Sequence, residues 1–205
     1  MLKRTAIAAL ALIAAAAQGA PTKAAPQVLT CASPVRQGES AASIKARFGK
    51  AARVMQVDGP EGMQFPALVV WPGDPARRIE VLFDDGDRAM RRATSVRIVS
   101  DGSKWRIAGL GVGARLADVV KANGREVTVG GFGWDYGGSV DARGGLLEHL
   151  PGGCAVGLIM DTGPDVAEPP QGVFGDGVIL KSDDPLLKAA SPRVVELTYY
   201  WPRRK

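Results

Sequence analysis

Two short segments bounded by glycines recur in the chain at a constant spacing, and they limit its possible folds more than any other feature. The first is Gly38–Gly49 and the second is Gly113–Gly124, so a shift of 75 residues superimposes their glycines. Ile44 in the first segment and Val119 in the second then match as aliphatic residues. Each segment predicts a helix of two to three turns that ends at its second glycine. Helices this short are not stable alone, so each must pack on other elements.

Strand-like segments follow both predicted helices. Residues 67–71, 79–83 and 96–99 follow the first, and residues 126–136, 155–160 and 194–201 follow the second. Along residues 79–83, Ile79, Val81 and Phe83 lie on one face and Glu80 lies on the other, as in a strand with one buried face. We therefore predict an α+β fold of two tandem repeats, each a short helix packed on a small antiparallel sheet. The repeats span residues 30–104 and 105–205, and the Gly-, Pro- and Asp-rich stretch 162–177 is a surface loop inserted in the second.

The start of the chain indicates export. Lys3 and Arg4 precede an apolar run of 12 residues, Ala6–Ala17, and small residues occupy positions 17 and 19. This pattern predicts a secretory signal peptide over residues 1–19, followed by an N-terminal extension over residues 20–29. The run is shorter than the roughly 20 residues that span a bilayer, so we expect no transmembrane segment. A composition rich in Ala, Arg and Gly is typical of a high-GC bacterium, which makes the periplasm the expected destination.

Cysteine, histidine and charge counts narrow the function classes. The chain has two cysteines, Cys31 and Cys154, and in an oxidising compartment they most simply form one disulfide. Their positions offer no CxxC spacing for a redox-active thiol. Two cysteines and the single His149 leave no four-Cys or multi-His metal site. A net charge of +5, scattered along the chain, does not favour nucleic acid as a partner.

The repeated pattern of glycine, short helix, glycine and antiparallel strands resembles the tandem repeat of β-lactamase inhibitory proteins. It is also similar to the single repeat of small outer-membrane-assembly lipoproteins of the SmpA/OmlA type. The likeness covers two stretches of 12 residues and the order of the strands. It implies an α+β fold and, by analogy, a protein that binds other proteins in the cell envelope.

Three motifs suggest catalysis or cofactor binding, each beside a simpler structural interpretation. Residues 109–114 spell GxGxxA, a dinucleotide-binding pattern, but they also suit a linker that leads into the second helix. Asp161-Thr162-Gly163 after two aliphatic residues is similar to the aspartic-peptidase signature, which needs a second carboxylate, and it equally suits a strand ending in an acidic turn. His149 has no recognisable nucleophile nearby in the sequence. We expect no catalytic residues and no cofactor.

Aromatic residues supply the strongest binding candidates. Strand alternation over 126–136 predicts that Phe132, Trp134 and Tyr136 share one face, either inside the core or as an exposed platform. Along Tyr199-Tyr200-Trp201, the same alternation requires Tyr200 and its two neighbours to point in opposite directions. The predicted contact residues are Trp134, Asp135, Tyr136, Trp71 and Tyr200.

These observations favour a non-catalytic periplasmic protein that recognises a partner protein of the envelope, as an inhibitor or an assembly accessory. Two alternatives remain open at this point. One is a small-ligand or glycan binder that uses the same aromatic residues, and the other is an aspartic-type peptidase centred on Asp161.

Overall fold

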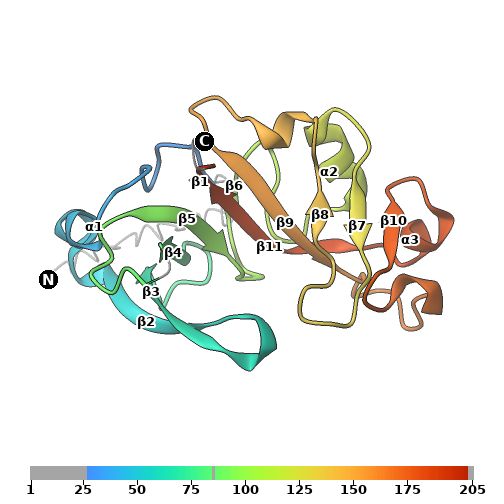
Figure 1. Cartoon of the computed structure of the whole chain (residues 1–205), viewed down its shortest axis with the longest axis horizontal. Coiled ribbons are helices and arrows are strands. Elements are labelled where there is room, and N and C mark those ends of the chain that lie inside the picture. The colour runs from blue at the N-terminus through green and yellow to red at the C-terminus, as the bar shows by residue number, and fades with distance from the viewer. Residues whose placement is uncertain (1–26, 85, 203–205) are drawn as a thin grey trace, which may run out of the picture.

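The computed structural model describes residues 27–84 and 86–202, and it confirms the α+β class. Its main element is a six-stranded antiparallel sheet with the strand order β2-β3-β4-β5-β11-β9 (Figure 1). The strands are β2 (Ala52–Asp58), β3 (Gln64–Val70), β4 (Ile79–Phe83), β5 (Ala93–Ile98), β9 (Ala155–Asp161) and β11 (Arg193–Tyr200). The predicted signal peptide lies outside the described residues, and so does most of the predicted extension.

Two smaller sheets flank the main one. One has the order β10-β7-β8 and contains β7 (Thr128–Gly130), β8 (Val140–Asp141) and β10 (Ile179–Lys181). The other pairs β1 (Gln27–Val28) in parallel with β6 (Trp105–Arg106). Met160 in β9 donates its backbone N–H to the Gly138 carbonyl at 2.8 Å, just before β8. The three-stranded sheet therefore continues the main sheet beyond β9.

The two predicted helices form at the expected places. Helix α1 (Ala41–Phe48) begins at Ser40, whose hydroxyl accepts a hydrogen bond from the Ser43 backbone N–H at 3.2 Å, as an N-cap should. Helix α2 (Leu116–Asn123) ends at Gly124, which has the left-handed φ of 73° that glycine adopts without a steric penalty. A third helix, α3 (Pro185–Ala189), and four 3-10 turns complete the elements; the turns are η1 (Gly49–Ala51), η2 (Pro60–Gly62), η3 (Leu146–Glu148) and η4 (Gln171–Val173).

Both long helices pack on one face of the main sheet. Ile44 of α1 and Val119 of α2 are fully buried in the same cluster as inward side chains of the strands, such as Leu68, Val96 and Leu197. Burial of this apolar surface is what stabilises helices of only eight residues. Within residues 27–84 and 86–202 no helix packs on the opposite face of the main sheet, which we refer to as the open face.

The predicted disulfide is confirmed. Cys31 is bonded to Cys154, so the segment that follows β1 is fixed to the residue that precedes β9. Two hydrogen bonds from the aromatic end of the chain hold the same segment: Trp201 Nε1 donates to the Cys31 carbonyl at 3.0 Å, and the Tyr199 hydroxyl donates to the Val35 carbonyl at 3.3 Å. No helix in the described part of the chain is long and apolar enough to cross a membrane.

The strand predicted over residues 126–136 is wrong beyond Gly130. Strand β7 stops there, and residues 131–139 leave the sheet as a loop, which we call the 131–139 loop. Its return is set by Gly138, which has a φ of 70° and lies so close to the Met160 carbonyl that a Cβ would collide with it. The alternation argument therefore does not apply: Phe132 is buried, whereas Trp134 and Tyr136 are exposed.

The two halves of the chain meet at the middle of the main sheet. Their last strands, β5 and β11, pair with each other, with Arg97 opposite Thr198. The residues before each helix make a similar backbone hydrogen bond to these strands. The Gly38 N–H donates to the carbonyl of Ala93, the first residue of β5, and the Gly113 N–H donates to the carbonyl of Val194, near the start of β11. That the halves are copies of one unit stays a prediction.

Candidate functional site

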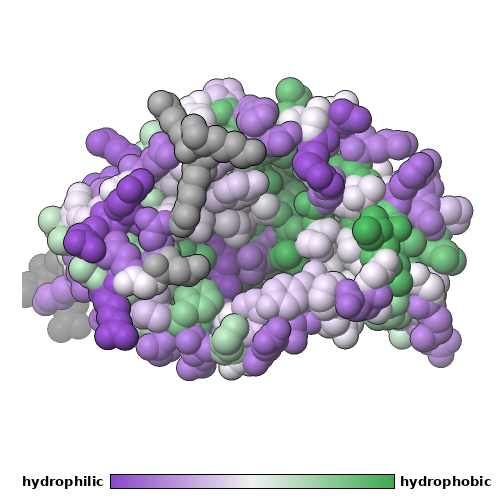
Figure 2. All heavy atoms as spheres, viewed as in Figure 1, coloured by the Kyte–Doolittle hydropathy of each residue, from purple (hydrophilic) through white to green (hydrophobic). Residues whose placement is uncertain are grey.

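The open face of the main sheet forms a cleft of about 970 Å³. Its floor comes from alternate residues of β4, β5, β11 and β9, and its walls are the β2–β3 hairpin on one side and the 131–139 loop on the other. Figure 2 shows a hollow near the middle of the molecule, above the β2–β3 hairpin, with hydrophilic residues in its depth. Apolar residues also line the cleft, namely Val57, Phe65, Leu82, Val99, Tyr136 and Ile159.

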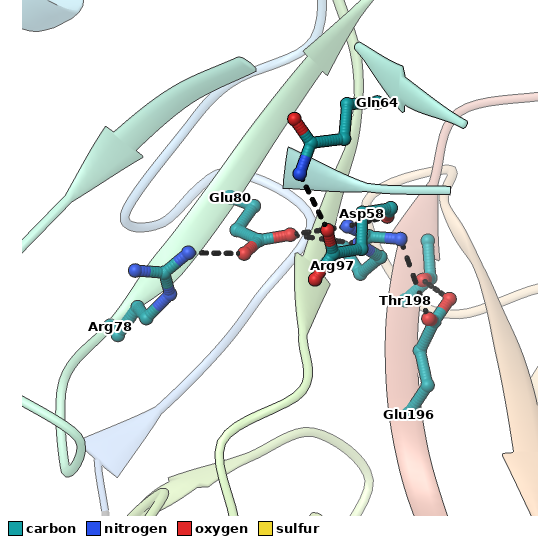
Figure 3. A network of polar contacts seen from close by, with 7 residues as sticks. All are labelled: Asp58, Gln64, Arg78, Glu80, Arg97, Glu196 and Thr198. Atoms are coloured by element: carbon teal, nitrogen blue, oxygen red, sulfur yellow. Dashed lines mark hydrogen bonds and ion pairs between the residues drawn. The ribbon is translucent and has the colours of Figure 1, made fainter. Parts of the chain in front are cut away.

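A charged network occupies the floor of the cleft (Figure 3). Glu80 of β4 is only 2% exposed, and its carboxylate accepts hydrogen bonds from Arg78 at 2.6 Å and from Arg97 Nε at 2.8 Å. Arg97 of β5 also donates to the backbone carbonyl of Asp58 at 2.8 Å, so it connects the floor to the β2–β3 hairpin. Short bonds between ionised groups of this kind are stronger than neutral hydrogen bonds. They hold the Arg97 guanidinium in place.

Glu196 of β11 is the less completely paired acid of this network. Its carboxylate lies 3.7 Å from Arg97 and accepts a hydrogen bond from the Thr198 hydroxyl at 3.3 Å. Burial raises the pKa of Glu196, and the nearby Arg97 charge offsets this rise only in part. The isolated protein therefore keeps a partly buried carboxylate beside an open cleft.

The two walls of the cleft touch each other at one point. The Tyr136 hydroxyl of the 131–139 loop donates to Glu61 in η2, at the tip of the β2–β3 hairpin, over 3.3 Å. The Glu61 charge raises the pKa of Tyr136. Within the loop, Trp134 Nε1 donates to the Gly131 carbonyl at 2.9 Å, and the Trp134 and Tyr136 rings lie 5.6 Å apart. These contacts hold Tyr136 at the edge of the cleft although half of its surface is exposed.

Neither a protein-family model, nor a curated protein, nor a solved structure matches this chain. The function must therefore be inferred from the chemistry of its own residues.

The structure brings together only part of the predicted contact set. Trp134, Asp135 and Tyr136 lie on the 131–139 loop, and the last two line the cleft. Tyr200 is exposed and points to the open face by strand alternation with Glu196, but it does not line the cleft. Trp71 is elsewhere.

Trp71 lies beyond the end of β3, on the core side of the sheet. Its ring packs against Phe48 of α1 at 5.0 Å and against Trp105 at 5.9 Å, and it adjoins the buried cluster under the helices. The Arg77 guanidinium covers the ring at 5.4 Å. Trp71 therefore contributes to packing and does not share a surface with the 131–139 loop.

The motifs considered for chemistry occupy structural positions. Asp161 ends β9, and within the described residues both of its side-chain hydrogen bonds come from Thr162. In the GxGxxA stretch, the Gly113 N–H donates a hydrogen bond to the Val194 carbonyl of β11. The Asp118 carboxylate accepts from the Arg115 N–H at the start of α2, where a bound pyrophosphate would have to lie. His149 directly follows η3 and does not line the cleft. Residues 27–84 and 86–202 contain no cluster of three or more His, Cys, Asp or Glu side chains that could hold a metal ion.

The charged network was not predicted from the sequence. The pattern of residues 79–83 placed Glu80 opposite the core, but an acid at such a position normally reaches solvent. The sequence feature that could have indicated the network is an acid in the middle of a strand, Glu80, with arginines at positions 78 and 97. It could not be used without the strand register that sets Glu80 directly opposite Arg97.

Proposed function

We propose that this chain is a non-catalytic binding protein of the periplasm that recognises a partner protein in the cleft on its open face. The observation that supports this most is the composition of that face. An uncovered sheet face is normally polar and needs little internal organisation. Here it combines half-exposed apolar residues with a fixed charged network, and the 131–139 loop adds Trp134 and Tyr136 at its edge.

The energetic cost of the network supports a functional role. Removing carboxylates and guanidiniums from water costs several kcal/mol per ion, and hydrophobic residues of similar size often give equal or greater stability. Glu80 and Arg97 are therefore poor choices if the face had only to be stable. A rigid pattern of charges surrounded by apolar surface is what specific protein interfaces use for selectivity.

The disulfide supports the proposed compartment, because such bonds persist mainly in oxidising environments such as the periplasm. Export by a signal peptide at residues 1–19 is part of the same proposal.

Site-specific photo-crosslinking in the native organism tests the proposal. A benzophenone amino acid is placed at Tyr136, at the edge of the cleft. The matched control is Ile179, which is 73% exposed on β10 and does not line the cleft. We expect one dominant protein adduct from position 136 that position 179 does not give. Equal adducts from both positions, or an adduct of position 136 with a glycan, would contradict recognition of a protein in the cleft.

A further inference from the structure

The charges that line the cleft have the opposite sign to the chain as a whole. The chain carries a net charge of +5. Two arginines, Arg78 and Arg97, and four acidic residues, Asp58, Glu80, Asp135 and Glu196, line the cleft. Glu61 adds another carboxylate at the rim, where it accepts the bond from Tyr136. The cleft is thus an acidic site on a basic protein, and it attracts positive charge.

The two arginines of the cleft are already used within the protein. Arg78 is bonded to Glu80, and Arg97 is bonded to Glu80 and to the Asp58 carbonyl. Of the two acids on the floor, Glu80 accepts short hydrogen bonds from arginines, whereas Glu196 accepts one from a neutral donor, Thr198, and forms a longer ion pair with Arg97 at 3.7 Å. A positively charged group that approached within hydrogen-bond distance would complete its pairing and offset the cost of its burial.

The surroundings of Glu196 suit a long aliphatic side chain with a charged end. Ile159 of β9 is the strand neighbour of Glu196, and Val99 also lines the cleft. The methylene groups of lysine or arginine can pack on such apolar residues while the charged end reaches a carboxylate.

We propose that the cleft accepts a lysine or arginine side chain of the partner protein, with Glu196 as the carboxylate that pairs with it. Ile159 and Val99 contact the aliphatic part of that side chain, and Tyr136 closes the site at the loop. This inference rests on the proposed function, because it names the chemistry of the partner at the same cleft.

Selection from a displayed library of random peptides tests the inference with a defined probe. The target is the folded, disulfide-bonded chain. Bound peptides are sorted by whether they still bind an Ile159→Trp variant, whose larger side chain takes up the space of the cleft beside Glu196. We expect the cleft-dependent peptides to share one basic residue. Its replacement by norleucine, for lysine, or by citrulline, for arginine, should weaken binding by about tenfold or more.

A double-mutant cycle identifies Glu196 as the pairing group. Glu196→Gln should weaken binding of the parent peptide by a similar factor, and it should have little further effect on the neutral peptide. Asp183→Asn, which removes one exposed carboxylate outside the cleft, is the charge-matched control and should leave binding unchanged. Unfolding curves of both variants exclude misfolding as the cause.

The outcomes separate the two proposals. Cleft-dependent peptides that lack a basic residue, or that bind Glu196→Gln as well as the parent, would overturn the inference and leave the proposed function intact. If no selected peptide depends on the cleft, both proposals fail.

Discussion

Replacing Glu80 by alanine removes the acid that holds the charged network of the cleft together. The Arg97 side chain is only 12% exposed, so its two bonds to Glu80, at 2.8 Å from Nε and 2.7 Å from Nη2, cannot be fully replaced by water. The Arg78 side chain is 25% exposed and can turn toward solvent, so its lost bond should cost little. The destabilisation therefore comes mainly from an unpaired Arg97.

The expected size of the effect follows from these contacts. Hydrogen bonds to charged groups contribute about 1.5–3 kcal/mol each, and breaking a buried ion pair from one side costs about 3–5 kcal/mol. Because Arg97 keeps its bond to the Asp58 carbonyl and its contact with Glu196, we expect the low end, about 3 kcal/mol. For a chain of this size the midpoint of thermal unfolding, Tm, should then fall by about 6–12 °C.

Urea unfolding followed by tryptophan fluorescence, with the disulfide intact, measures this loss. Glu80→Gln is the matched variant, because it keeps the shape and one acceptor oxygen and should lose less. The double variant Glu80→Met/Arg97→Met removes both charges and should recover most of the stability, within about 1 kcal/mol of the parent. A loss below about 1 kcal/mol for Glu80→Ala would refute the reasoning, since it would mean that water already compensates Arg97.

Three further predictions concern stability. Replacing Cys31 and Cys154 together by alanine should lower the free energy of unfolding by about 4–5 kcal/mol, and the reduced parent should show the same loss in urea. Gly138→Ala should cost roughly 2–4 kcal/mol because of the positive φ and the collision with a strand carbonyl, whereas Gly73→Ala, on an open turn, should change stability little. Burial raises the pKa of Glu196, so the native state holds this proton more tightly than the unfolded chain and the parent loses stability as pH rises above about 4. Glu196→Gln should therefore match the Tm of the parent near pH 4 and exceed it at pH 7; an equal difference at both pH values would contradict this.

Local patterns in the sequence predicted α1, α2 and every strand of the main sheet except β2. Gly49 and Gly124 mark the ends of α1 and α2, so the C-terminal boundary of each helix was predicted. Strand β4 was predicted from alternation with its observed limits. The 131–139 loop was missed because Phe132, Trp134 and Tyr136 alternate with small residues as they would in a strand. The loop returns where Gly138 closely approaches β9, which is distant in the sequence.

The site was harder to predict, because it depends on register between strands. Asp135 and Tyr136 could be selected from composition, since exposed aromatic residues beside a charge are common in binding surfaces. Trp71 was selected on the same basis and belongs to the packing under α1 instead. Glu80 and Glu196 become one site only through β5, whose Arg97 lies between them. No local pattern contains that relation.

The central place of β11 has a consequence for how the protein reaches its folded state. Although β11 is the last strand along the described chain, it is the element that joins β5 to β9. Until it arrives, the strands β2–β5 and the strand β9 have no shared hydrogen bonds in the main sheet, and Glu196 is missing from the cleft. During synthesis from the N-terminus the protein must therefore remain incompletely folded until residues 193–200 emerge. A nonsense mutation just before Arg193 should abolish the cleft and the fold together, even though such a truncated chain would contain most of the residues.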